Sequence, residues 1–158
     1  MSTVVHDPPR SYDWALLILR VVVGVIFFAH GLQKITSMGL TGFGDALASM
    51  GVPLAGVLGP VVTLGELLGG VALILGLLTR VVGAGLAIDM LGAIALVHLP
   101  GGVFAPDGIE FVMLLCAANL AFLIAGAGRY SIDGLLRGRR HGLAPAGVTG
   151  AGTARRVA

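Results

Sequence analysis

The fold of this chain is decided by residues 54–78, which read LAGVLGPVVTLGELLGGVALILGLL. The run is long enough to cross a bilayer, because a spanning helix needs about 20 apolar residues. Glu66 is the only charged residue in the run. A carboxylate at this depth is costly unless it faces a partner or a water-filled cavity. Gly65 and Gly69 share a helix face with each other and favour close approach of a second helix. We therefore expect a spanning helix that points Glu66 into a helix bundle.

Composition extends this prediction to the whole chain. Of its 158 residues, 56% are hydrophobic, 11% are charged and 26 are glycine. Soluble domains carry about 25% charged residues and about 7% glycine, so the composition indicates an integral membrane protein. Cys116 is the only cysteine and lies in an apolar run, which excludes an internal disulfide and any cysteine-rich zinc site. We expect no metal site.

The apolar runs predict the organisation of the fold. We expect an all-α integral membrane protein, a four-transmembrane-helix bundle, with spans at about 14–36, 54–78, 81–99 and 109–125. The first span begins near Trp14 and lacks a cleavage site after a short apolar core, so we expect it to be retained as the first transmembrane helix. We divide the chain into a cytoplasmic lead (1–13), a membrane domain (14–128) and a basic, largely disordered cytoplasmic tail (129–158).

A short amphipathic segment separates the first two spans. Within residues 37–53, the apolar side chains of Phe43, Leu47 and Met50 recur at helical spacing. This pattern predicts a short helix on the membrane surface, with a mobile loop as the alternative.

The distribution of positive charge predicts the orientation. With four spans, the opposite side has only Lys34, whereas six arginines fall together on one side: Arg10, Arg80, Arg129, Arg137, Arg139 and Arg140. Positive residues mark the cytoplasmic side, so both termini should be cytoplasmic. The basic tail either serves this topology alone or also contacts anionic membrane lipid.

Polar groups inside the spans form a candidate buried polar site. Helix rise places Arg20 and Asp89 at roughly 9–14 Å from the cytoplasmic ends, and His30 and Glu66 at roughly 18–24 Å. The same calculation places Lys34, His98 and Glu110 at roughly 27–30 Å from the cytoplasmic ends, near the outer interface. Matching depths predict three pairs: Arg20 with Asp89, His30 with Glu66, and Lys34 with Glu110. Such pairs either fix helix register or, for His30 with Glu66, relay protons, and the sequence leaves both roles open.

Four motifs in order resemble the DoxX family of small membrane proteins. They are HGLQK (30–34), GELLGG (65–70), GLLTR (76–80) and GAGRYSID (126–133), and the resemblance covers about residues 14–135. It implies a four-helix, multi-pass protein of the prokaryotic inner (plasma) membrane. It also implies a link to thiosulfate:quinone oxidoreductase and to redox assemblies with superoxide dismutase and a sulfurtransferase in oxidative-stress defence. The polar positions implied by the family are His30, Lys34, Glu66, Arg80 and Glu110.

The resemblance leaves the activity open. The chain has no cysteine pair, haem motif or flavin fingerprint of its own, so we expect no intrinsic cofactor, and electron transfer would need a quinone or a partner subunit. Three functions remain: a membrane subunit of a redox or oxidative-stress complex that contacts quinone and a soluble redox partner, a small transporter that works as a homo-oligomer, and a scaffold without chemistry. Nucleic-acid binding is not supported, because the basic tail is short and lacks interleaved aromatic residues.

Overall fold

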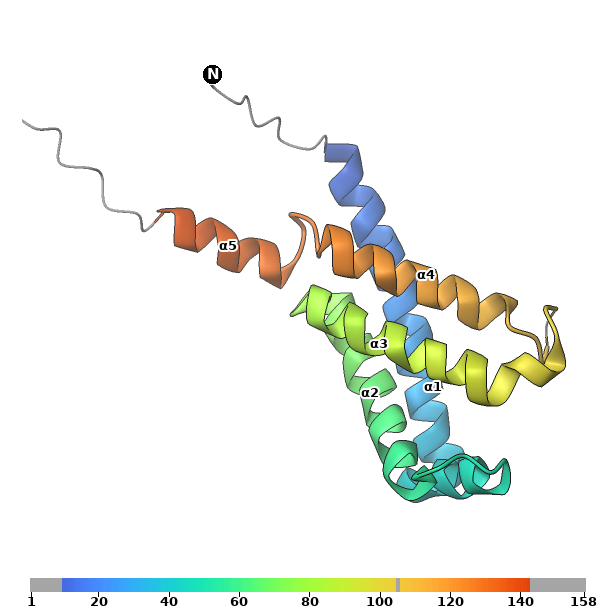
Figure 1. The fold of residues 1–158 in the computed structure, drawn as a ribbon. Coiled ribbons are helices and arrows are strands. Elements are labelled where there is room, and N and C mark those ends of the chain that lie inside the picture. The colour runs from blue at the N-terminus through green and yellow to red at the C-terminus, as the bar shows by residue number, and fades with distance from the viewer. Residues whose placement is uncertain (1–9, 105, 143–158) are drawn as a thin grey trace, which may run out of the picture.

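The described part of the chain, residues 10–104 and 106–142 of a computed structural model, is helical and contains no strand (Figure 1). The helices are α1 (Arg10–Ser49), α2 (Ala55–Leu75), α3 (Thr79–Ala93), α4 (Glu110–Ala125) and α5 (Ile132–Gly142). A π-helical turn (Ile94–His98) and a 3-10 turn (Leu99–Gly101) extend α3.

Three helical stretches in the described residues are long and apolar enough to cross a membrane. They are Arg10–Ser49, Ala55–Leu75 and Thr79–Gly101, whereas the apolar α4 is shorter, at 16 residues. The prediction of an all-α membrane protein is confirmed. A fourth span, with both termini on one side, stays a prediction.

A kink at Gly39 divides α1. Gly39 has φ 73° and ψ 176°, a backbone conformation that glycine adopts readily and other residues rarely do. Beyond it, the segment predicted as a surface helix is helical as far as Ser49. Its Leu47 packs with Val52 and Ala55 at the start of α2, which gives this segment a small core of its own.

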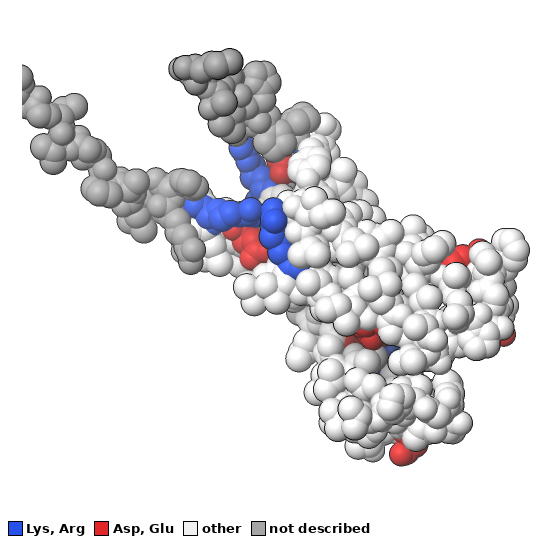
Figure 2. All heavy atoms as spheres, in the orientation of Figure 1, with Lys and Arg blue, Asp and Glu red and all other residues white. Residues whose placement is uncertain are grey.

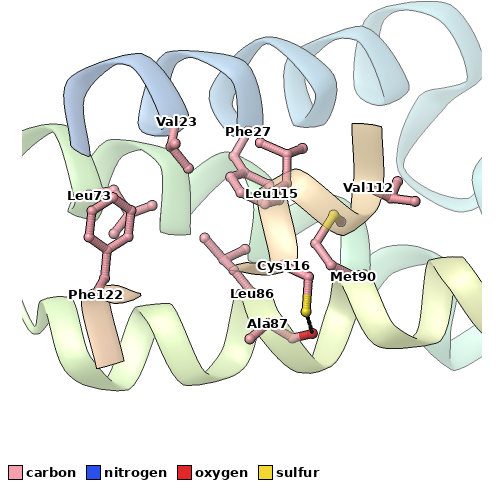
Figure 3. Packing of buried hydrophobic residues seen from close by; sticks show 10 residues of the cluster. All are labelled: Val23, Phe27, Leu73, Leu86, Ala87, Met90, Val112, Leu115, Cys116 and Phe122. Carbon is pink, nitrogen blue, oxygen red and sulfur yellow. Dashed lines mark hydrogen bonds between the residues drawn. The ribbon is translucent and has the colours of Figure 1, made fainter. Parts of the chain in front are cut away.

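The four longer helices form two crossing hairpins. α1 packs along α2, and α3 packs along α4. Figure 1 shows the two hairpins close together where α2 turns into α3 and diverging away from that turn. Their shared core holds ten buried residues contributed by all four helices (Figure 3): Val23, Phe27, Leu73, Leu86, Ala87, Met90, Val112, Leu115, Cys116 and Phe122. The Cys116 thiol is buried in this core and donates to the carbonyl of Ala87, as expected of an inert thiol.

Glycine allows the close contact between α1 and α2. A Cβ on Gly24 would lie 2.8 Å from the carbonyl oxygen of Gly70, and a Cβ on Gly70 would overlap the backbone of Phe28. The close approach predicted at Gly65 is wrong, because a Cβ there would meet no atom within 4 Å, and a Cβ at Gly69 would meet only the side chain of Leu86. Their face of α2 turns toward the other hairpin, which reaches Gly69 through Leu86 and has diverged at the level of Gly65.

Gly70 and Gly65 therefore provide a matched pair of variants. Gly70→Ala should destabilise the protein by about 1–3 kcal/mol, because the added methyl group forces backbone apart. Gly65→Ala should leave stability unchanged or raise it slightly, because alanine favours helix and the methyl group meets open space. Denaturation in detergent checks both, and equal losses would show that α1 and α2 do not pack at Gly70.

The segment after α4 is fastened to the end of the bundle where α2 turns into α3. The Asp133 carboxylate accepts hydrogen bonds from the backbone N–H groups of Leu78 and Thr79, each at 2.9 Å, and so caps the start of α3. The N–H of Asp133 donates to the carbonyl of Gly76 at 2.9 Å. The last predicted family motif, which ends at Asp133, thus holds this end together. α5 was not predicted from the sequence, and the rest of the predicted disordered tail, residues 143–158, lies outside the described residues.

Candidate functional site

A cavity of about 960 Å³ lies between the two hairpins, where α2 and α3 diverge. Its walls come from α1, α2, α3, the π-helical turn and α4, and most of the lining side chains are apolar. Val61 and Leu68 of α2 and Ile88 of α3 line it and are exposed, so its mouth lies between these two helices. Figure 2 shows this recess, with acidic atoms inside it and white surface around it.

An ion pair is set into the wall of the cavity. The ammonium group of Lys34 on α1 contacts the carboxylate of Glu66 on α2, and their side chains are only 16% and 6% exposed. Lys34 also lies over the Phe43 ring, 4.7 Å from its centroid, which adds a cation–π contact. The pair forms because Gly31 packs directly on the backbone of Leu67 and brings this turn of α1 beside Glu66.

Three more ionisable groups line the same cavity. Asp89 lies on α3, and its Oδ2 atom is buried with no hydrogen-bond partner in the described residues. His98 lies on the π-helical turn, with Nδ1 3.2 Å from the carbonyl oxygen of Asp107. His30 lies on α1, with its ring 6.2 Å from that of Phe111. The structure therefore gathers five predicted site residues at one cavity: His30, Lys34, Glu66, Asp89 and His98.

The predicted pair of Arg20 with Asp89 is wrong. Arg20 is 1% exposed and donates to the carbonyl oxygens of Ala127, at 2.9 Å, and Tyr130, at 2.8 Å. The loop after α4 returns over α1 and supplies these acceptors, which depth matching could not reveal. Arg20 therefore belongs to the closed end of the bundle and not to the cavity.

The predicted pair of His30 with Glu66 is replaced by the pair of Lys34 with Glu66, and the predicted pair of Lys34 with Glu110 stays a prediction. Lys34 comes one helical turn after His30 on the same face of α1, and its long side chain reaches the carboxylate assigned to the histidine. Glu110 begins α4 and is not among the residues that line the cavity.

A smaller pocket of about 180 Å³ adjoins the cavity at α1. Gln33 and Ser37 line it, together with His30 and Lys34, which also line the large cavity. His30, Gln33, Lys34 and Ser37 follow one another at spacings of three and four residues, so they lie on one face of α1. Among the described residues, no group of three or more histidine, cysteine or acidic side chains could hold a metal ion.

Comparison with known proteins assigns the family. The model of the family described as DoxX matches residues 15–99, more than half of the chain. The chain belongs to the DoxX family. This match confirms the resemblance given by the first three motifs, and the fourth motif lies beyond the matched residues.

The DoxX relatives match most of the chain. A Bacillus subtilis (strain 168) protein named "Putative oxidoreductase CatD" is 33% identical over 134 residues, which cover 84% of this chain and 96% of that protein. "Inner membrane protein YqjF" of Escherichia coli (strain K12) is 34% identical over a stretch that covers 78% of this chain and 93% of that protein. "Uncharacterized membrane protein Rv3486" of Mycobacterium tuberculosis is 32% identical over a stretch that covers 75% of this chain and 79% of that protein. No solved structure matches the chain significantly.

Proposed function

We propose that this DoxX-family protein is the membrane subunit of a redox complex and that its cavity binds a quinone. The observation that carries the proposal is an apolar cavity, open between α2 and α3, with the buried pair of Lys34 and Glu66 in its wall. A quinone combines a long apolar tail with a small polar ring. The tail fits the apolar lining, and the mouth between two apolar helix faces gives access from the bilayer.

The ionisable groups at the cavity suit the chemistry of a quinone. Reduction to the hydroquinone consumes electrons and protons, and positioned carboxylates and imidazoles can supply the protons. Glu66, Asp89 and His30 all line the cavity and can hold or pass them. The proposal assigns the supply of electrons to a soluble partner protein. The oxidoreductase in the name of the Bacillus relative supports a redox role, and the family resemblance extends the proposal to oxidative-stress defence.

The orientation in the membrane follows from charge. Four arginines lie on segments near one end of the bundle: Arg10 begins α1, Arg80 of α3 lies beside Gly126, Arg129 donates its N–H to Asp13, and Arg137 lies on α5. Figure 2 shows basic atoms, in blue, gathered where α5 meets the bundle and where α1 begins. The ring centroids of Trp14 and Tyr130 lie 4.7 Å apart there, with the rings tilted by 41°, and Trp and Tyr are enriched at membrane interfaces. We place this end, with both termini, in the cytoplasm of a prokaryote and the protein in its inner membrane. A fluorescent reporter fused to the C-terminus should therefore be active, and activity of a periplasmic reporter there would overturn this placement.

Purification from native membranes tests the quinone proposal. The tagged protein is purified in mild detergent and extracted with organic solvent, and the extract is analysed by mass spectrometry. We expect quinone in near-stoichiometric amount and a soluble redox enzyme in the same eluate. Another four-helix membrane protein, purified in parallel, sets the background. Quinone at background level with no co-purified enzyme would contradict the proposal and favour the hypothesis of a scaffold or a transporter.

A further inference from the structure

Two glycines on α3 face the cavity without an evident structural reason. Gly85 and Gly92 lie on either side of Asp89 on one face of the helix, at spacings of four and three residues. Glycine inside a helix is destabilising relative to alanine. Neither glycine has a positive φ, and a Cβ on either would meet no atom within 4 Å. Both line the cavity, so what they provide is bare backbone beside the Asp89 carboxyl group.

The wall that α2 contributes to the cavity also exposes backbone without a side chain. Gly65 of α2 lines the cavity next to Glu66, and a Cβ on it would also meet no atom within 4 Å. Bare backbone on α2 and α3 leaves room for a flat group between the two helices. Such a group would lie within the reach of Asp89.

Asp89 offers unused hydrogen-bonding capacity at this place. An ionised carboxylate only accepts hydrogen bonds, and a buried acceptor without a donor is unfavourable. Asp89 lines the cavity and makes no hydrogen bond or ion pair in the described residues, and the Lys34 ammonium pairs with Glu66 instead. Only the Oδ2 atom of Asp89 is buried, which leaves Oδ1 as the acceptor that a ligand in the cavity can reach. A ligand that brings a hydroxyl donor would use this capacity.

We infer that the ring of the ligand lies along the Gly85–Asp89–Gly92 face of α3 and donates a hydroxyl hydrogen bond to the Asp89 carboxylate. The inference rests on the proposed function and deepens it by naming the redox form of the ligand that the cavity binds more tightly. A hydroquinone carries hydroxyl donors, whereas the carbonyl groups of a quinone only accept. The cavity therefore selects the hydroquinone over the quinone.

Binding of the two redox forms tests the inference. Decylubiquinol and decylubiquinone are titrated calorimetrically into the purified protein without oxygen, at a mildly alkaline pH where carboxylic acids are ionised. The wild type should bind the quinol about tenfold more tightly or better, as one hydrogen bond to a charged group provides. Asp89→Asn should bring the two affinities close together. Asp45→Asn, a change at an exposed acid outside the cavity lining, should keep the wild-type ratio.

Glycine variants test the position of the ring. Gly85→Leu and Gly92→Leu should weaken binding of both forms about tenfold or more, because the side chains fill the groove. Gly56→Leu is the matched control, because a Cβ there also meets open space but Gly56 does not line the cavity. Wild-type affinity for Gly85→Leu and Gly92→Leu would overturn the assigned position.

The outcomes separate this inference from the proposed function. Equal affinities in the wild type, tighter binding of the quinone, or an unchanged ratio in Asp89→Asn would overturn the inference and leave quinone binding intact. Failure of the wild type to bind either form would overturn the proposed function itself. The ratio of quinol to quinone affinity in the wild type tests the inference even where a variant does not fold.

Discussion

Replacing Arg20 with methionine should destabilise the protein by about 3 kcal/mol. The guanidinium donates to the carbonyl oxygens of Ala127 and Tyr130, and it is 1% exposed. Methionine fills most of the space but leaves two carbonyl groups with reduced hydrogen bonding, and each such loss costs about 1–3 kcal/mol. The measurement is chemical unfolding in detergent, followed by the fluorescence of Trp14, the only tryptophan.

Two further variants show whether the loss arises from these contacts. Arg129→Met removes an exposed arginine at the same end of the bundle and should change stability by less than about 0.5 kcal/mol. Exchange of charge between Arg20 and Asp89 in a double variant should restore nothing, because the two side chains serve different parts of the bundle. Recovery of stability in that double variant would show that Arg20 pairs with Asp89 after all.

Replacing Lys34 with methionine should have an effect of similar or larger size. The change removes the partner of Glu66 and leaves a largely buried carboxylate uncompensated, which costs about 3–5 kcal/mol when one side of a buried pair is removed. The double variant Lys34→Met with Glu66→Leu should regain most of the loss, because apolar residues often replace a buried ion pair without cost. The free energies of unfolding of the two single variants and the double variant form a complete mutant cycle.

The cycle also separates the roles of the pair. A double variant that is stable but no longer carries quinone would show that the pair serves the ligand as well as the fold. A double variant as unstable as Lys34→Met alone would mean that the two groups do not interact, and the site would lose its central contact.

The apolar helices were predictable because their signal is contained in the residues themselves. Apolar runs gave α1, α2 and α4 to within a few residues, apart from the continuation of α1 past Gly39. The π-helical turn Ile94–His98 was predicted only as part of a continuous helix, because its apolar residues do not reveal the change of winding. The helix α5 was not predicted, because it has no apolar run of its own.

The residues of the site were more predictable than their partners. Helix rise gives the depth of a side chain but not the direction or reach of its charged atom. Depth therefore indicated Glu66 and Asp89 correctly as internal groups, yet assigned Lys34 to the outer surface. It also could not anticipate that Arg20 donates its hydrogen bonds to the backbone carbonyl oxygens of Ala127 and Tyr130. The cavity itself depends on how far α2 and α3 diverge, and no local pattern encodes that distance.

A density map of the protein in lipid nanodiscs made from its native membranes tests the central claim most directly. We predict α2 and α3 apart, Lys34 against Glu66, and elongated density in the cavity with its head between Gly85 and Gly92. A map with α2 and α3 closed on each other, side chains filling the space and Glu66 turned toward the acyl chains would contradict it.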